Sequence, residues 1–225
     1  MAFRLVLPVL LLAAAPRPAG GQSAVPPPGR VELFRDLATD GLAGWSEIRL
    51  ANRPSRYRVA SEGERPVLSA ESYGGNSAVW RRVDVAADRG TTVSWRWKVE
   101  RSLSGNRRER SRRGDDFAAR VFVVFDAPEG PWSGKALCYV WAATEPVGSI
   151  YASPYTGDVA MIVMESGDAR AGSWVDVERN VLEDYRRAFG GVPATLSGIA
   201  IVVDTDNTQS RARAWFDRLV VSRSP

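Results

Sequence analysis

The sequence predicts an all-β protein, an antiparallel two-sheet sandwich of the jelly-roll type with one short α-helix near residues 181–189. Residues 91–100 alternate between apolar and polar side chains, a period of two that is typical of a strand with one face in a core. Many apolar runs follow one another without alternating helical segments, which argues against a parallel α/β sheet. Clusters of Gly, Pro, Asn and Asp separate the runs, as at residues 74–76 and 127–130, and these clusters indicate turns.

Further apolar runs indicate where the other strands lie. Four runs are apolar at almost every position, so we expect central strands that are covered on both faces. These runs cover residues 117–125, 137–142, 159–164 and 199–203. Shorter or more polar runs predict additional strands at residues 57–60, 67–70, 78–85, 174–178 and 212–221.

One segment has the periodicity of a helix. Asn180 is suited to cap a helix that covers residues 181–189. Within it, Leu182, Tyr185 and Phe189 fall on one stripe, as expected for a helix that packs one face on a core. Two glycines and a proline follow and predict its end.

The first residues are typical of a secretion signal. A start with one arginine precedes an apolar run at residues 5–15, and small side chains follow at 19–21. The run is too short to cross roughly 30 Å of hydrocarbon, so we expect a signal peptide over residues 1–21 rather than an anchor. A Pro-rich lead-in over residues 22–30 and a single β-sandwich domain over residues 31–223 would follow. We therefore expect a periplasmic or secreted protein without a membrane span.

The composition excludes several kinds of catalytic site. The chain has no histidine, so it has no Ser-His-Asp or Cys-His triad and no histidine-ligated zinc. Its one cysteine, Cys138, lies in an apolar run, which indicates a buried structural thiol and leaves no partner for an intrachain disulfide. Acid–base chemistry would therefore fall to carboxylates, Tyr, Lys, Ser or Thr.

Positive charge is concentrated in one segment. Residues 101–113 hold six arginines and one acid, Glu109, in a chain whose net charge is +4. Such a run of like charge would be costly to bury, so we expect a solvated loop that folding does not need. No nucleic-acid-binding motif accompanies the segment, and we expect no nucleic-acid partner.

Several short sequence motifs along the chain are similar to those of one protein family. They lie at residues 95–99, 114–125, 138–141, 178–180, 184–185, 189–190, 204–208 and 214–217. Together they resemble the bacterial family called domain of unknown function 3047, from about Val31 to Val221. The family carries no established activity, and its overall pattern is similar to carbohydrate-binding jelly rolls. The resemblance implies a fold and leaves the chemistry to be argued from the site.

Acidic residues stand before one predicted central strand and after another. Two precede the strand at 117–125 and a group follows the strand at 199–203, so antiparallel pairing would bring both groups to one rim. Oxygen ligands at alternating positions suit a hard cation, which makes Ca²⁺ the candidate cofactor. The candidate ligands are Asp115, Asp116, Asp204, Asp206 and Asn207.

Arginines offer a different way to balance the charge of this rim. Arg120 shares a strand face with Asp116, and Arg179 stands beside Glu178 at the end of another predicted strand. We expect Glu178 to join the rim. A network of arginines and carboxylates that locks the sheets together is therefore the alternative to a metal or ligand site.

A second cation candidate joins the two ends of the predicted domain. Glu32 lies near its beginning, and Asp217 lies in its last strand. First and last strands often pair in jelly rolls, so the two carboxylates would share one ion.

Eight tryptophans are present, and aromatic rings that stack on sugars are one use for them. Trp132 lies in a loop rich in Gly and Pro, which makes it the best candidate for an exposed ring. The strand at 174–178 places one tryptophan and two carboxylates on one face, which suits the apolar face and hydroxyls of a sugar. The candidate ligand-binding residues are Trp132, Tyr139, Trp141, Trp174, Asp176, Glu178, Arg120 and Arg179.

These observations favour an extracytoplasmic, non-catalytic binding module for a glycan or another cell-envelope polymer. A carboxylate-dependent glycoside hydrolase or lyase is one alternative, with Asp116 and Glu178 as its pair of acids. A structural or assembly protein of the cell envelope is the other. The sequence leaves the ligand and the oligomeric state open.

Overall fold

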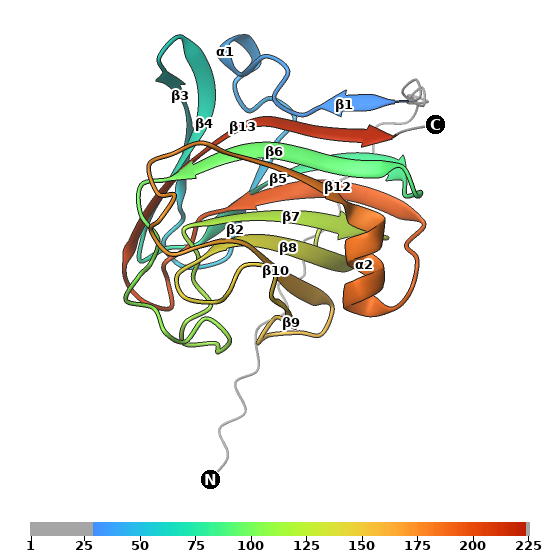
Figure 1. Ribbon diagram of the computed structural model, residues 1–225. Coiled ribbons are helices and arrows are strands. Elements are labelled where there is room, and N and C mark those ends of the chain that lie inside the picture. Colours follow the sequence, from blue (N-terminus) through green and yellow to red (C-terminus); the bar gives the residue numbers. More distant parts are fainter. Residues whose placement is uncertain (1–28, 224–225) are drawn as a thin grey trace.

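Two β-sheets pack face to face in the computed structural model, which describes residues 29–223 (Figure 1). The six-stranded sheet contains β1 (Arg30–Glu32), β3 (Arg56–Glu62), β4 (Arg65–Tyr73), β6 (Thr91–Val99), β11 (Val175–Asn180) and β13 (Arg211–Arg223). Its order is β11-β6-β13-β4-β3, and β1 pairs with β13. Every pair in this sheet is antiparallel.

The seven-stranded sheet holds the strands that the sequence predicts to be central. It contains β2 (Ser46–Arg49), β5 (Ser77–Ala86), β7 (Ala119–Phe125), β8 (Lys135–Ala142), β9 (Ile150–Ala152), β10 (Val159–Ser166) and β12 (Thr195–Val202). Its order is β2-β5-β12-β7-β8-β10-β9. One pair, β8 with β10, is parallel, since residues 143–158 give the chain enough length to cross back. The predicted all-β two-sheet sandwich is confirmed, with this one departure from antiparallel pairing.

The main core lies between the sheets. In residues 92–99 of β6 the apolar residues are buried and the polar ones partly exposed, as their alternation predicts. Trp95 and Trp97 are 1% and 0% exposed, and their rings contact those of Tyr139 and Trp141 across the sandwich, at centroid distances of 5.2 and 5.9 Å. Large aromatic side chains therefore hold the two sheets together.

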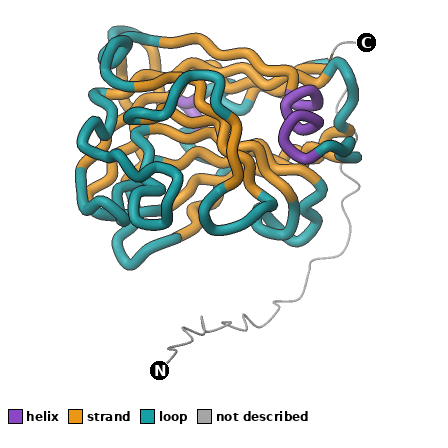
Figure 2. Tube along the Cα trace, turned by 60° about the horizontal axis from the view of Figure 1, so that its bottom comes forward, coloured by secondary structure: helices purple, strands orange, loops and turns teal. Residues whose placement is uncertain are grey.

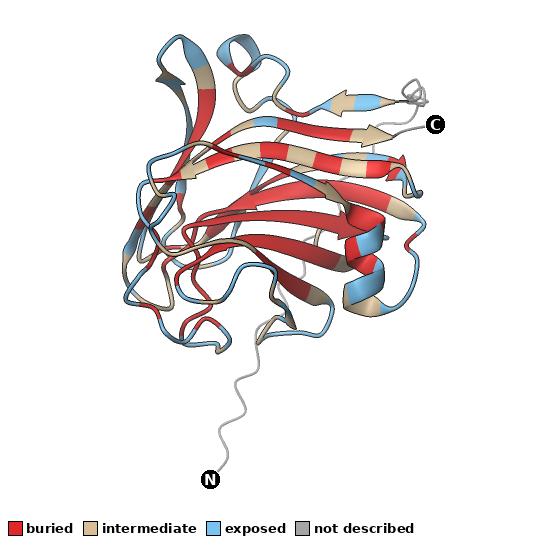
Figure 3. Cartoon of the chain, viewed as in Figure 1, coloured by how far each residue is buried: buried red, intermediate tan, exposed pale blue. Residues whose placement is uncertain are grey.

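The outer face of the seven-stranded sheet is apolar as well. Phe122, Val140 and Met161 belong to a second buried cluster, together with Cys138, which is 0% exposed as the sequence predicts. Figure 3 shows the difference: the central strands β12, β7 and β8 are buried along most of their length, whereas β6 alternates. Loops cover part of the outer face, and the remaining part is available to line a cleft.

The structure contains the predicted helix, α2 (Val181–Phe189). The side chain of Asn180 accepts a hydrogen bond from the Glu183 backbone N–H at 3.0 Å, and Gly190 ends the helix with a φ of 77°. In Figure 2, α2 lies at the right, with long loops at the left. A four-residue helix, α1 (Leu37–Asp40), was not expected from the sequence.

The guanidinium groups of the arginine-rich segment are exposed, but its backbone is held by buried contacts. The carboxylate of Glu109, which is 1% exposed, accepts backbone hydrogen bonds from Ala143, Thr144 and Glu145 at 2.6 to 3.0 Å. The Asn106 amide donates to the Gly114 carbonyl at 2.7 Å. These contacts argue against the expectation that folding does not need the segment.

The predicted signal peptide and most of the predicted lead-in lie outside the described residues. Arg30, the last residue of that lead-in, begins β1. Within the described part of the chain, neither helix has the length and apolar character needed to cross a membrane.

Candidate functional site

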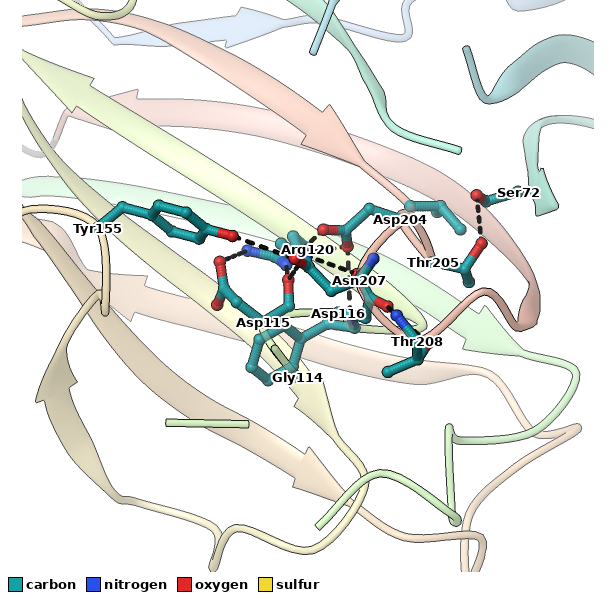
Figure 4. A network of polar contacts seen from close by, with 12 residues as sticks. Ser72, Gly114, Asp115, Asp116, Arg120, Tyr155, Asp204, Thr205, Asn207 and Thr208 are labelled. Carbon is teal, nitrogen blue, oxygen red and sulfur yellow. Dashed lines mark hydrogen bonds and ion pairs between the residues drawn. The ribbon is translucent and has the colours of Figure 1, made fainter. Parts of the chain in front are cut away.

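Two acidic loops meet at one end of the seven-stranded sheet. Arg120, near the start of β7, stands opposite Val202, the last residue of β12, so the loops before β7 and after β12 lie side by side. Carboxylate oxygens of Asp116, Asp204 and Asp206 lie within 4.8 Å of one another. The structure thus brings these acids together with Asp115 and Arg120, as Figure 4 shows in part.

Arg120 is the buried cation of this cluster. Its side chain is 5% exposed, and its Nε donates to Asp204 Oδ1 at 2.9 Å while an Nη group donates to Asp204 Oδ2. A further Nη contacts Asp115 Oδ2 at 3.4 Å, and the guanidinium also donates to the Asp115 carbonyl. Burial alone would lower the pKa of Arg120, but the charges of Asp115 and Asp204 outweigh it and hold that pKa well above its usual value. The guanidinium therefore stays charged.

Asp116 organises the turn after β12. Its Oδ1 accepts hydrogen bonds from the backbone and side-chain nitrogens of Asn207 at 3.2 and 3.1 Å. Its Oδ2 accepts from the backbone and hydroxyl of Thr208, both at 2.5 Å. Both oxygens are thus occupied by donors of the chain, and a cation in this cluster would compete with them. The Ca²⁺ site expected from the sequence is untested, and these donors favour the arginine network as the explanation of the cluster.

Three buried acceptors beside this network have no donor among residues 29–223. They are Oδ1 of Asp115, Oδ1 of Asp206 and Oδ1 of Asn76. All three residues line one cavity of about 460 Å³. Burial raises the pKa of Asp115, because the opposing charge of Arg120 only partly offsets it. Burial also raises the pKa of Asp206, with a further contribution from the charge of Asp116.

Aromatic rings form the walls of the same cavity. Trp132, in the loop after β7, is 52% exposed and packs edge to face on Phe122 at a centroid distance of 6.5 Å. Tyr155, in the loop after β9, is 50% exposed, and its hydroxyl lies 3.1 Å from Asn207 Oδ1. Phe122, Met161 and Val202 add apolar surface. We call this cavity the cleft.

The sequence reached part of the cleft. It singled out Trp132 and the polar residues around Arg120, but it missed Tyr155, Asn76 and Phe122. The only signal for Tyr155 is an aromatic residue inside a turn of Ser, Pro, Gly and Asp at residues 153–158. Asn76 lies in a turn that the sequence marks for its shape alone.

Two predicted ligand contacts are corrected, because they belong to the core. Tyr139 and Trp141 are 0% and 1% exposed on the inner face of the seven-stranded sheet. The Tyr139 hydroxyl donates to Asp184 at 2.9 Å, and the Trp141 indole donates to the Gly167 carbonyl at 3.0 Å. Neither ring is open to a ligand.

Arg179 and Glu178 lie at the other end of the sandwich, so they are not part of the predicted acidic rim. Arg179 forms an ion pair with Asp184, the buried acid of α2, at 2.5 Å, which ties the helix to β11. Glu178 stands opposite Ser94, near the start of β6, and thus far from the loop before β7. The predicted acid pair of Asp116 and Glu178 is therefore wrong.

The remaining candidates lie on the outer face of the six-stranded sheet. Asp176 and Glu178 line a cavity of about 510 Å³ that Glu32 and Asp217 also line. Arginines stand against three of these acids: Arg96 against Asp176 at 3.0 Å and Asp217 at 3.8 Å, and Arg30 against Glu32 at 2.9 Å. The ring of Trp174 lies beneath the Arg96 guanidinium, at 5.2 Å from its centroid. Among the described residues, no group of three close carboxylates forms on this face.

A scan of family models finds one match, described as "Protein of unknown function (DUF3047)", over residues 43–220. No curated protein matches the chain.

Among solved structures, the family 11 carbohydrate-binding module from Clostridium thermocellum, in complex with a β-1,3-1,4-mixed-linked tetrasaccharide, is 9% identical with a TM-score of 0.44. The match covers 86% of this chain and 95% of that one. The xyloglucanase domain of NopAA from Sinorhizobium fredii, in complex with cellobiose, is 9% identical with a TM-score of 0.45, covering 80% and 93%. Endoglucanase 3 of family GH12 from Trichoderma harzianum is 12% identical with a TM-score of 0.45, covering 80% and 91%.

Proposed function

The chain belongs to the DUF3047 family of proteins of unknown function, and we propose from the geometry of its cleft that it is a non-catalytic binding module for a saccharide. In this proposal the saccharide is part of a glycan or cell-envelope polymer, and the protein acts outside the cytoplasm. The observation that carries the proposal is the presence of donor-free acceptors and exposed aromatic rings in one cavity.

The acceptors define what the ligand must supply. A buried acceptor without a donor costs about 1–3 kcal/mol, so the cleft gains most from a ligand that brings hydrogen-bond donors. Each Oδ1 of Asp115, Asp206 and Asn76 is buried in the cavity wall, so a small shift of the side chain would let it accept from a ligand hydroxyl. A saccharide carries several hydroxyls close together, which matches three acceptors in one cavity.

The aromatic walls define the shape of the ligand. Sugar rings present apolar C–H faces beside their hydroxyl edges, and such faces pack on aromatic rings. Trp132 and Tyr155 are half exposed, and each is held in place by contacts to Phe122 or to Asn207. A volume of about 460 Å³ is within the range of pockets for small organic ligands.

A glycoside hydrolase is the second candidate, and one observation favours it. Burial raises the pKa of Asp115 and of Asp206, and both line the cleft, so each keeps its proton to a higher pH than an ordinary aspartate, as a general acid must. A hydrolase needs two carboxyls flanking the scissile bond. Release of reducing ends from a polysaccharide panel would identify this activity.

The test is saccharide binding by the purified protein, on a glycan array and by calorimetry. We expect Trp132→Ala and Asp206→Asn to abolish binding to the best array ligand. Trp174→Ala is the matched control, because that tryptophan lies on the other sheet beneath Arg96. Loss of binding in the control, with Trp132→Ala unaffected, would move the site to the six-stranded sheet and refute the cleft.

A further inference from the structure

A basic pocket lies on the other side of the acidic loops. Its volume is about 710 Å³, and it is bounded by residues 101–108, 113, 208, 210 and 211. Five arginines line it and no acid does. They are Arg101, Arg107, Arg108, Arg113 and Arg211.

These guanidinium groups have no carboxylate partner in the described part of the chain. Within residues 29–223, none of the five forms an ion pair, although the neighbouring Arg110 pairs with Glu145 at 2.7 Å. Arg211 lies instead over the ring of Tyr73, at 4.8 Å from its centroid. Five like charges around one pocket repel one another, and an anion in the pocket would relieve this repulsion.

The backbone that carries the arginines is fixed, so their gathering does not depend on side-chain pairing. Glu109 anchors the middle of the segment through its buried carboxylate. At the beginning, the Ser102 N–H donates to Asp168 Oδ1 at 2.6 Å. The backbone N–H of Arg108 donates to Asn106 Oδ1 at 3.1 Å. The pocket is therefore prepared before any ligand arrives.

A buried hydroxyl adds a neutral donor. Ser102 lines the pocket and is 1% exposed, and its Oγ has no hydrogen-bond partner among the residues that the structure describes. Thr208 and Ser210 line the opposite side. Hydroxyl donors among guanidinium groups are well suited to bind the oxygens of a phosphate or sulfate group.

We propose that this pocket binds phosphate or sulfate groups carried by a polysaccharide. No aromatic residue lines the pocket, so it offers no platform on which nucleic-acid bases would stack. The choice of a polysaccharide rests on the proposed function of the cleft. Arg113 and Thr208 line the pocket while Asp115 and Asn207 line the cleft, so the same two loops separate the two sites.

The test compares dextran sulfate, neutral dextran and inorganic phosphate as probes. We expect the protein to bind dextran sulfate but not dextran, and inorganic phosphate to compete with dextran sulfate. The double variant Arg107→Gln/Arg108→Gln should weaken dextran sulfate binding at least tenfold. The matched control is Arg186→Gln/Arg187→Gln, two adjacent exposed arginines on α2, and it should change the affinity less than twofold.

Three outcomes would overturn the proposal. Equal losses in both double variants would show that only net charge matters. Absence of competition by phosphate would show that the pocket does not hold an oxyanion. A single-stranded oligonucleotide that binds more tightly than dextran sulfate at equal salt would show that the partner is a nucleic acid. Failure of the cleft is seen separately, because the phosphate probe carries no sugar and Trp132→Ala should leave its binding unchanged.

Discussion

Arg120 of β7 and Asp204 of the loop after β12 form a two-pronged ion pair, with side chains only 5% and 2% exposed. The same guanidinium reaches Asp115, and Asp204 also accepts from the Phe117 N–H at 3.1 Å. One cation thus sets the positions of the two loops that form the end of the cleft. The arginine–carboxylate network anticipated as an alternative to a metal site is therefore present, and within residues 29–223 it leaves Asp206 Oδ1 without a hydrogen-bond donor.

Replacement of Arg120 should unfold or strongly destabilise the protein. Arg120→Leu leaves Asp204 buried without its partner, and breaking a buried pair in this way costs about 3–5 kcal/mol. Urea denaturation followed by tryptophan fluorescence measures the change. Arg58→Leu, which removes an exposed pair with Glu71, is the control and should cost no more than about 1 kcal/mol. Similar losses in both variants would contradict the assigned role of Arg120.

The ionised carboxylate of Asp206 should lower the stability of the folded protein at neutral pH, although the same residue supports ligand binding. Burial raises its pKa, so the ionised carboxyl is less favourable in the folded protein than in the unfolded chain. Stability linked to this group should therefore rise as the pH falls through the raised pKa, and level off below the ordinary pKa of an aspartate. Asp206→Asn removes the charge, and we expect a higher Tm than wild type at neutral pH, with the gap closing toward about pH 4.

The control for this prediction is Glu129→Gln, which removes one negative charge from an exposed loop. Its Tm should follow that of the wild type at every pH. A Tm for Asp206→Asn that stays below wild type would mean that the Asp206 carboxylate stabilises the fold. Because the variant should also lose saccharide binding, gain of stability and loss of function would occur together.

The sequence predicted strands well, but not which of their faces is inner or outer. Tyr139 and Trp141 lie on the same face of β8. Because both faces of β8 are apolar, the sequence does not indicate that this face packs against the other sheet. The proximity of Asp115 and Asp204 is predictable, because these residues flank β7 and β12, two apolar strands that pair with each other. The position of Glu178 is not predictable in this way. Its strand, β11, belongs to the six-stranded sheet, and the strand order of that sheet decides at which end of the sandwich Glu178 lies.

The missed residues share a different cause. Tyr155 and Glu109 act through contacts with loops that are distant in the chain, as in the hydrogen bond between Tyr155 and Asn207. Periodicity describes strands and helices, and it carries no information on how irregular loops fold against one another. A buried acid inside a run of arginines looks, from the sequence, like one more solvated charge.

Removal of the Glu109 carboxylate should destabilise the protein, because this carboxylate accepts hydrogen bonds from a distant loop. Glu109→Ala leaves three backbone N–H groups at residues 143–145 without an acceptor, and such orphaned groups cost about 1–3 kcal/mol each at most. We expect a Tm well below wild type. Arg107→Gln, two residues away and exposed, should leave the Tm unchanged. Deletion of residues 104–111 should reduce soluble yield, and an unchanged Tm after that deletion would show that the segment only decorates the surface.

Ca²⁺ should leave the stability of the protein nearly unchanged. The cluster of Asp116, Asp204 and Asp206 offers oxygens within 4.8 Å of one another, which is the spacing that a cation would need. However, both oxygens of Asp116 already accept two hydrogen bonds each, and Arg120 neutralises Asp204. A cation would have to displace these donors, so we expect equal Tm values in EDTA, Mg²⁺ and Ca²⁺. A rise in Tm with Ca²⁺ that disappears in Asp206→Asn but persists in Glu129→Gln would establish a calcium site here and replace the arginine network as the explanation of this cluster.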